Sequence, residues 1–278
     1  MPELPEVETI ARALRLGGRG GPALVGRHIQ AVSLLWPRTL AEPAPAAFAS
    51  RITTQPITDI GRRGKFILIR LKPDTLLVHL RMSGDLLVEP QSAPLAVHHR
   101  LLIDLSGVEN LRLAFNDPRK FGRVWLVSDP ERILAGLGPE PLDPAFTPQD
   151  LYQRLHSTHR QLKPLLLDQS FIAGLGNIYA DEALHQARLH PLQAAHTLSF
   201  SQAARLWESI RSVLADGIQR QGASIDWVYR GGDFQNYFCV YQRTGQPCLH
   251  CGTIVQRIVV GQRGTHFCPV CQPFLEGE

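Results

Sequence analysis

Hydrophobic positions recur at helical spacing near the start of the chain. Ile10, Ala13 and Leu14 fall on one stripe, and glycines at positions 17, 18, 20 and 21 follow them. Residues spaced by three and four lie on one face of a helix, and a glycine cluster commonly ends one. The pattern therefore predicts a helix over Glu3–Leu16.

Shorter apolar segments with turn residues between them fill the next hundred positions. Several short strands joined by turns are typical of an antiparallel sandwich or barrel. The predicted strands are His28–Trp36, Lys65–Leu71, Thr75–Met82, Leu101–Leu105, Asn110–Phe115 and Gly122–Val127. We therefore expect an antiparallel β-sandwich with a flanking helix over residues 1–137.

The pattern changes after three prolines at positions 139, 141 and 144, which favour an extended linker. Apolar residues then return to helical spacing, as at Ala180, Ala183, Leu184 and Ala187. The predicted helices are Gln149–His156, Leu162–Asp168, Ile178–Arg188 and Ser201–Arg220. The whole chain is thus expected to be α+β and multidomain, with a helical domain over 145–238 and a small β-rich finger over 239–273.

Composition agrees with a globular protein. The chain has 278 residues, of which 44% are hydrophobic and 19% charged, enough apolar side chains for a real core. It has no run of 18 apolar residues for a membrane span, and its acidic, proline-bearing start does not resemble a signal peptide. We expect a cytoplasmic protein whose thiols stay reduced.

The overall charge of +4 is ordinary, but its distribution is not. Phe234–Leu275 contains no Asp, Glu or Lys, while it carries Arg243, Arg257 and Arg263. A stretch with one sign of charge can hold phosphates.

Four cysteines have the spacing of a zinc site. Cys248 and Cys251 form one Cys-x-x-Cys pair, Cys268 and Cys271 form another, and sixteen residues separate the two pairs. Four thiolates make a closed tetrahedral site, so the expected cofactor is one structural Zn²⁺. The alternative is four reduced thiols without metal. Cys239 lies outside the pattern and is expected to be a small buried hydrophobe.

The residues between the two cysteine pairs are long enough for a hairpin. We expect its strands within Thr253–Phe267 and its turn at Gly261 and Gly264. Arg263 then lies near the tip, where it is either a solvated arginine or a phosphate contact.

A glycine-rich segment, Ile172–Asn177, leads directly into a predicted helix. Glycine lets the backbone approach a ligand, and a helix N-terminus presents free N–H groups. Asn177 either caps its own helix or contacts that ligand. With Leu162–Asp168 in front, the arrangement is helix, two turns, helix, which can grip a DNA backbone.

The second residue is a proline. If Met1 is removed, Pro2 becomes a secondary amine with a pKa near 8, so part of it is unprotonated at neutral pH. Such an amine can attack a sugar C1′ and give an iminium ion. Glu3 and Glu6 lie beside it in sequence. The alternative is an ordinary helix start.

Together these motifs resemble the formamidopyrimidine-DNA glycosylase family from one end of the chain to the other. The matching segments occur in the family's order: Met1–Thr9, Arg63–Lys65, His79–Gly84, Asn116–Gly122, Leu137–Leu142, Gly174–Ala180 and the Cys₄ finger.

The resemblance implies catalytic roles. Pro2 would be the nucleophile that forms the Schiff base, and Glu3 the general acid/base. Lys65 would act in β-elimination and Arg263 in δ-elimination, while Asn177 would contact the DNA backbone. Glu6 would support the site by hydrogen bonding.

The resemblance also implies a wedge. An enzyme that works on C1′ must take the nucleotide out of the stack, and apolar side chains with a cation can fill the gap. Met82 and Phe121 would fill it, and Arg119 would face the orphaned cytosine. His99 and Arg160 are expected to contact DNA at positions where this sequence departs from the family pattern.

The implied activity is that of a bifunctional glycosylase and AP lyase. It would remove 8-oxoguanine and formamidopyrimidines from duplex DNA and cleave the abasic site by β,δ-elimination. The expected enzyme is a monomer in the bacterial cytosol or nucleoid, with no membrane partner and no nucleotide cofactor. The family loop that covers the flipped base, here 222–237, has its own sequence.

Two other functions compete with this one. A glycosylase of the endonuclease VIII type would prefer oxidised pyrimidines, but the intact wedge set argues against it. A non-catalytic zinc-ribbon protein that binds damaged DNA would not need Pro2, Glu3 or Lys65.

Overall fold

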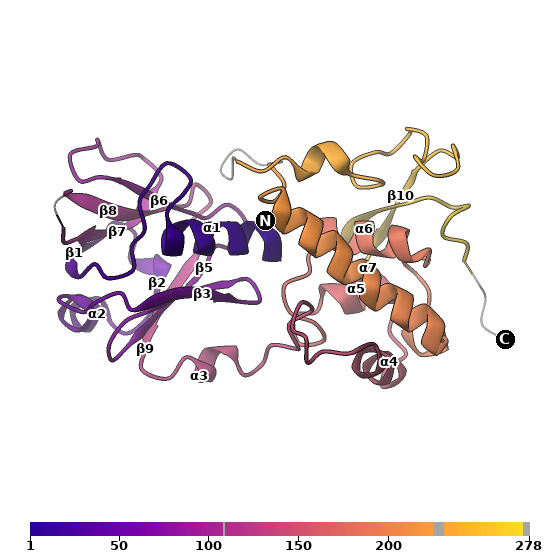
Figure 1. The fold of residues 1–278 in the computed structure, drawn as a ribbon, viewed down its shortest axis with the longest axis horizontal. Coiled ribbons are helices and arrows are strands. Elements are labelled where there is room, and N and C mark those ends of the chain that lie inside the picture. The colour runs from indigo at the N-terminus through magenta and orange to yellow at the C-terminus, as the bar shows by residue number, and fades with distance from the viewer. Residues whose placement is uncertain (108, 225–230, 275–278) are drawn as a thin grey trace. The chain divides into compact units, whose positions relative to one another are not determined.

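The chain forms two compact units, drawn as a ribbon in Figure 1. The structure is a computed structural model and describes residues 1–107, 109–224 and 231–274. The first unit consists of residues 1–135 and 221–232, and the second of residues 136–220 and 233–278.

The first unit begins with helix α1, Leu4–Leu16. Its buried side includes Ile10 and Leu14 of the predicted stripe and Val7, which lies one turn before Ile10. Gly17 follows the last turn with φ 88° and donates its N–H to Ala13 O, as expected for a glycine that ends a helix. The predicted helix is therefore confirmed, with Glu3 as the residue before its first turn.

Two sheets make up most of this unit. The four-stranded sheet has the order β1-β7-β8-β6, with β1 Ile29–Leu34, β6 Asp85–Pro90, β7 His99–Leu105 and β8 Leu111–Asn116. The five-stranded sheet has the order β2-β9-β5-β4-β3, with β2 Leu40–Glu42, β3 Asp59–Arg63, β4 Phe66–Arg70, β5 Thr75–His79 and β9 Arg123–Val127. Neighbouring strands run antiparallel except β2 and β9, which are parallel. The antiparallel sandwich is confirmed apart from that short edge pair.

One contiguous cluster of buried side chains joins both sheets to the helices. It takes Ile67 and Ile69 from β4, Leu101 and Ile103 from β7, and further residues from α1. Helix α1 packs on β3 and β4. Two short helices were not predicted, α2 Pro45–Ile52 and α3 Glu131–Leu134.

Four helices dominate the second unit. They are α4 Pro148–His156, α5 Leu162–Leu167, α6 Asn177–Ala187 and α7 Phe200–Gln219, each within one residue of its prediction. Helix α6 packs against α5, α7 and the finger, and α4 packs against α7. The predicted arrangement of helix, two turns and helix is confirmed. Among the described residues, no helix has both the length and the apolar character needed to cross a membrane.

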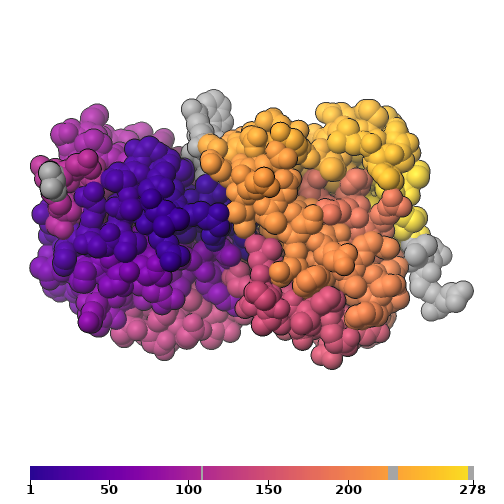
Figure 2. All heavy atoms as spheres, viewed as in Figure 1, coloured from indigo at the N-terminus to yellow at the C-terminus, as the bar shows by residue number. Residues whose placement is uncertain are grey.

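The finger is a two-stranded hairpin. Strands β10, Gln256–Val260, and β11, Arg263–Phe267, are joined by Gly261 and Gln262, whose φ angles are 55° and 63°. Two successive positive φ values fit the tight turns that match strand twist. The turn prediction was wrong at Gly264, which lies inside β11 opposite Val259. Strand β11 packs against helix α6 of the same unit, and Figure 2 draws the atoms of the finger in yellow.

Candidate functional site

A buried carboxylate organises the start of α1. Pro2 and Glu3 are both buried. Glu3 N donates to Glu6 Oε2 at 2.7 Å, and Ala223 N donates to Glu6 Oε1 at 2.8 Å. Since Glu6 is 2% exposed, both of its oxygens act on backbone N–H groups away from bulk water. Glu6 therefore fixes the residue proposed as acid/base and a second segment of the same unit.

That second segment, residues 222–224, is the beginning of the loop that is expected to cover the flipped base. Gly222 has φ 84°, and a Cβ there would lie 2.7 Å from Glu6 Oε1, so glycine is required twice over. Ser224 Oγ donates to Gly232 O at 2.7 Å and so joins residues 224 and 232. Residues 225–230 of the predicted loop lie outside the described part of the chain.

Lys65 lies in the turn between β3 and β4, one residue before the strand that it was predicted to begin. It is 5% exposed. Arg62 of β3 donates through Nε to Glu8 Oε2 of α1 at 3.0 Å, which fastens this hairpin to the helix. Glu3 and Lys65 thus come from two elements that pack on each other.

His79 pairs across the sheet with Phe66, next to Lys65. The two rings meet edge to face, with centroids 4.7 Å apart. Burial, then the charges of Arg81 and Lys65, lower the pKa of His79 to about 3. Its Nδ1 accepts from Arg81 N at 3.1 Å, so a neutral imidazole anchors the loop that carries Met82.

The three expected wedge residues come from two neighbouring loops. Met82 lies between β5 and β6, while Arg119 and Phe121 lie between β8 and β9. Phe121 is 50% exposed, and the Arg119 guanidinium carbon is 5.2 Å from its ring centre. An exposed aromatic ring beside a cation is available to contact a base.

One buried carboxylate joins these loops. Asp117 Oδ1 accepts from Ser83 Oγ at 2.6 Å, and Oδ2 accepts from Gly122 N at 2.7 Å. Ser83 Oγ also accepts from Arg119 N at 3.2 Å. Sequence reasoning assigned no role to Ser83 or Asp117, although the Asn-Asp-Pro turn signal at residues 116–118 marks the position.

The other two expected DNA contacts lie elsewhere. His99 is 4% exposed in β7, where its Nε2 is 3.7 Å from Glu89 Oε1 and burial lowers its pKa. Arg160 Nη1 donates to Asp168 Oδ2 at 2.7 Å. Hydrogen bonds from Arg160 and Ser170 hold the pKa of Asp168 at about 2. The DNA contacts of His99 and Arg160 stay predictions.

In the second unit, Asn177 and Arg263 are neighbours. Asn177 Nδ2 donates to Gly264 O at 3.0 Å, next to Arg263 in β11. The capping alternative was wrong: Gly176 is the N-cap, and Asn177 is the first helical residue, with its side chain bonded to the finger. Asn177 Oδ1 is buried without a hydrogen-bond partner in the described structure. Arg263 itself is exposed.

A buried ion pair between Lys163 and Asp181 lies next to Asn177. Lys163 Nζ donates to Asp181 Oδ1 at 2.5 Å and to Asn177 O at 2.9 Å. Asp181 Oδ2 accepts from both the backbone N and Nδ1 of His266 in β11. Helix α5, helix α6 and the hairpin therefore meet at one carboxylate, which sequence reasoning did not single out.

The four predicted zinc ligands gather at the base of the finger. The sulfur atoms of Cys248, Cys251, Cys268 and Cys271 all lie within 4.8 Å of one another. Tetrahedral zinc with bonds of about 2.3 Å places its sulfurs roughly 3.8 Å apart. The observed separations of 3.9 Å for Cys248–Cys271 and 3.4 Å for Cys251–Cys268 fit that geometry. Cys239 is not part of this cluster, as predicted, but it is half-buried, whereas a buried side chain was expected.

Comparison with known protein families gives three consecutive matches. Residues 1–124 match the formamidopyrimidine-DNA glycosylase N-terminal domain, and residues 137–228 match the H2TH domain of the same glycosylase. Residues 245–273 match the zinc finger found in FPG and IleRS. The Cys₄ cluster is accordingly the site of one structural zinc.

Relatives match along the whole chain. A formamidopyrimidine-DNA glycosylase of Symbiobacterium thermophilum is 46% identical over 100% of this chain and 91% of its own. One of Chloroflexus aurantiacus is 47% identical over 98% of each chain.

Solved structures agree with these matches. The Lactococcus lactis protein in complex with abasic-site DNA has a TM-score of 0.90 and 35% identity, covering 98% of this chain and 100% of that one. The same protein bound to Fapy-dG-containing DNA has a TM-score of 0.88 at the same identity and coverage. On this evidence the chain belongs to the formamidopyrimidine-DNA glycosylase family.

Proposed function

We propose that this chain is a base-excision repair glycosylase and AP lyase that removes oxidised purines from double-stranded DNA. Its substrates are 8-oxoguanine and formamidopyrimidines, and its product is a strand cleaved by β,δ-elimination. One observation carries the proposal. Pro2 and Glu3 directly precede helix α1, and this helix packs against the β3–β4 hairpin whose turn contains Lys65.

The chemistry begins at the amine of Pro2 after removal of Met1. The nitrogen attacks C1′ of the damaged nucleotide, the bond between C1′ and the base breaks, and the base leaves with a proton. Glu3 protonates the sugar ring oxygen, so that the ring opens and an iminium ion joins Pro2 to C1′. Burial of both residues supports this role, because a dry site strengthens each electrostatic interaction.

Two eliminations follow. Loss of a C2′ proton expels the 3′ phosphate, a step in which we assign Lys65 to the neighbouring phosphate. Loss of a C4′ proton then expels the 5′ phosphate, with Arg263 as its partner. Water finally hydrolyses the imine and releases the free amine. The exposed position of Arg263 on a zinc-held hairpin, with Asn177 bonded beside it, supports a contact with phosphate.

Met82, Arg119 and Phe121 would fill the gap left by the extruded nucleotide. The two loops that carry them are joined at one carboxylate, because Asp117 accepts from Ser83 next to Met82 and from Gly122 next to Phe121, and this supports a shared action on the duplex. We place the enzyme in the bacterial cytosol as a monomer. The reaction as written needs only DNA and water, so it calls for no nucleotide cofactor.

The test compares lesions in otherwise identical duplexes. We expect the zinc-loaded protein to excise 8-oxoguanine opposite cytosine at least about ten times faster than thymine glycol, and to leave phosphate at both ends of the gap. Faster excision of thymine glycol would favour the endonuclease VIII type of specificity. Binding to lesion duplex without any cleavage would favour a non-catalytic zinc-ribbon protein.

A further inference from the structure

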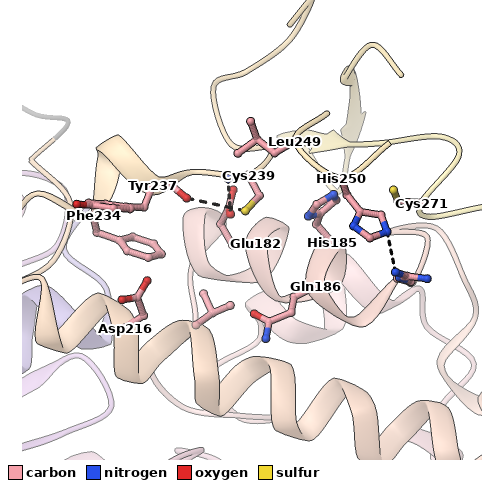
Figure 3. A pocket seen from close by; sticks show the side chains of 12 residues that line it. Glu182, His185, Gln186, Asp216, Phe234, Tyr237, Cys239, Leu249, His250 and Cys271 are labelled. Atoms are coloured by element: carbon pink, nitrogen blue, oxygen red, sulfur yellow. Dashed lines mark hydrogen bonds between the residues drawn. The ribbon is translucent and has the colours of Figure 1, made fainter. Parts of the chain in front are cut away.

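A histidine on helix α6 faces the first zinc-binding turn. His185 lies in the last turn of α6 and is 9% exposed. Its Nε2 is 3.5 Å from Cys248 Sγ. In Figure 3 His185 and Cys271 line the same cavity, which has a volume of about 430 Å³. The imidazole therefore approaches a metal ligand from the helical side of the unit.

Hydrogen bonds to sulfur matter at such a site because of its charge. Four thiolates around one Zn²⁺ leave a net charge of −2, and a buried charge is costly unless donors satisfy it. One donor comes from the backbone, since Cys271 N lies 3.4 Å from Cys268 Sγ. Cys248 is 3% exposed, and His185 Nε2 lies within hydrogen-bonding distance of its sulfur.

The direction of this hydrogen bond follows from the thiolate. A zinc-bound sulfur carries no proton, so it can only accept. Nε2 of His185 must therefore carry a hydrogen.

A second side chain from the end of the same helix holds the same turn. Arg188 Nη2 is 2.8 Å from His250 Nε2 (dashed in Figure 3), and His250 lies between Cys248 and Cys251. Because guanidinium only donates, His250 Nε2 accepts. Helix α6 thus reaches the first cysteine pair through His185 on the sulfur and through Arg188 on the turn itself.

We propose that His185 is a positioning residue for the structural zinc: its Nε2–H donates to the Cys248 thiolate and slows loss of the metal. Neither the lesion preference nor the elimination chemistry bears on this inference. It requires only the Cys₄ zinc site and the contact between α6 and the finger.

The experiment measures zinc release from the full-length, zinc-loaded protein into an excess of a coloured chelator. His185→Leu removes the donor, and we expect release about ten times faster than in the unsubstituted protein. His185→Gln places an amide N–H near Nε2, and we expect release within about two-fold of the unsubstituted rate. Gln186→Leu is the matched control, because Gln186 is exposed on the same helix and lines the same cavity.

Two results would overturn the proposal. One is an unchanged release rate in His185→Leu, and the other is equally fast release in the leucine and glutamine variants. The tautomer of His185 gives a readout without any variant, through ¹⁵N NMR of the zinc-loaded protein. We expect a hydrogen on Nε2, and a ring with its hydrogen on Nδ1 and none on Nε2 would reject the proposal even if the leucine variant failed to fold.

Discussion

Glu6 holds the backbone of Ala223, which lies 217 residues later in the chain, through a hydrogen bond of 2.8 Å. The other oxygen of the same carboxylate accepts from Glu3 N at 2.7 Å. Because both oxygens are engaged, the carboxylate cannot turn without breaking one of the two contacts. One side chain therefore positions both the backbone before α1, at Glu3, and the backbone at Ala223.

Replacing Glu6 by Gln should lower turnover by about ten-fold or more. One oxygen becomes an NH₂ group, so one of the two backbone N–H groups loses its acceptor, and a small displacement near reacting atoms is costly. Single-turnover excision of 8-oxoguanine measures the effect. Glu109→Gln in the same unit is the control, since Glu109 is 65% exposed, pairs with Arg27 at 3.8 Å and should change the rate by less than about two-fold. Equal rates in both variants would show that the Glu6 contacts do not matter for catalysis.

Ser83→Ala should weaken binding to lesion duplex by roughly five- to ten-fold. The substitution removes the hydroxyl that joins Asp117 to the Met82 loop, worth about 1 kcal/mol. Ser106→Ala offers a matched control, because Ser106 Oγ accepts one backbone hydrogen bond from His28 in the same unit. If the two variants bind lesion DNA equally well, the link between the two loops has no role in binding.

Breaking the buried pair of Lys163 and Asp181 should be strongly destabilising. Both side chains are fully buried, so Lys163→Met leaves Asp181 without its cation and should cost about 3 kcal/mol. The double variant, with Asp181→Leu added, should be less destabilised than the sum of the two single variants. Urea unfolding of the zinc-loaded proteins gives these values. If the loss of unfolding free energy in the double variant equals the sum of the losses in the two single variants, Lys163 and Asp181 are not directly coupled.

The buried ring of His79 predicts a loss of stability in mild acid. Its pKa is about 3 in the folded protein and 6.5 in the unfolded chain. Between those values the unfolded chain binds a proton that the folded protein does not, so stability falls as the pH drops. From pH 6.5 to 5 the loss from this group should reach about 1–2 kcal/mol. His79→Asn keeps an acceptor for Arg81 N and should show a smaller decrease; an identical pH profile would contradict this account.

The elements that were predicted well carry strong local signals. Helix α6 follows a glycine-rich segment and has small apolar residues at helical spacing, so its start was predicted within one residue. The zinc ligands were identified because metal geometry constrains the spacing of the cysteines. Helix α2 could have been found, since Pro45 lies at its first position and Phe48 and Ile52 are buried one turn apart.

Other features depend on distant partners. Strand β3 has one fully buried apolar side chain, Ile60, and its place in the sheet comes from pairing with β4. The role of Asp117 becomes visible only when the loop that carries Ser83 lies beside it. Asp181 likewise joins Lys163 and His266, residues that lie 103 positions apart in the sequence. Sequence patterns give periodicity and local turns, whereas these contacts are products of tertiary packing.

The most direct test of the account locates the covalent bond to DNA. The protein is incubated with a duplex that contains 8-oxoguanine opposite cytosine, the imine is reduced with borohydride, and the digested adduct is mapped by mass spectrometry. We expect a sugar remnant on the nitrogen of Pro2 in a chain that lacks Met1. In Pro2→Gly we expect any adduct to form more slowly than in the unsubstituted protein. An adduct on Lys65 or another lysine, or efficient cleavage by protein that retains Met1, would contradict it.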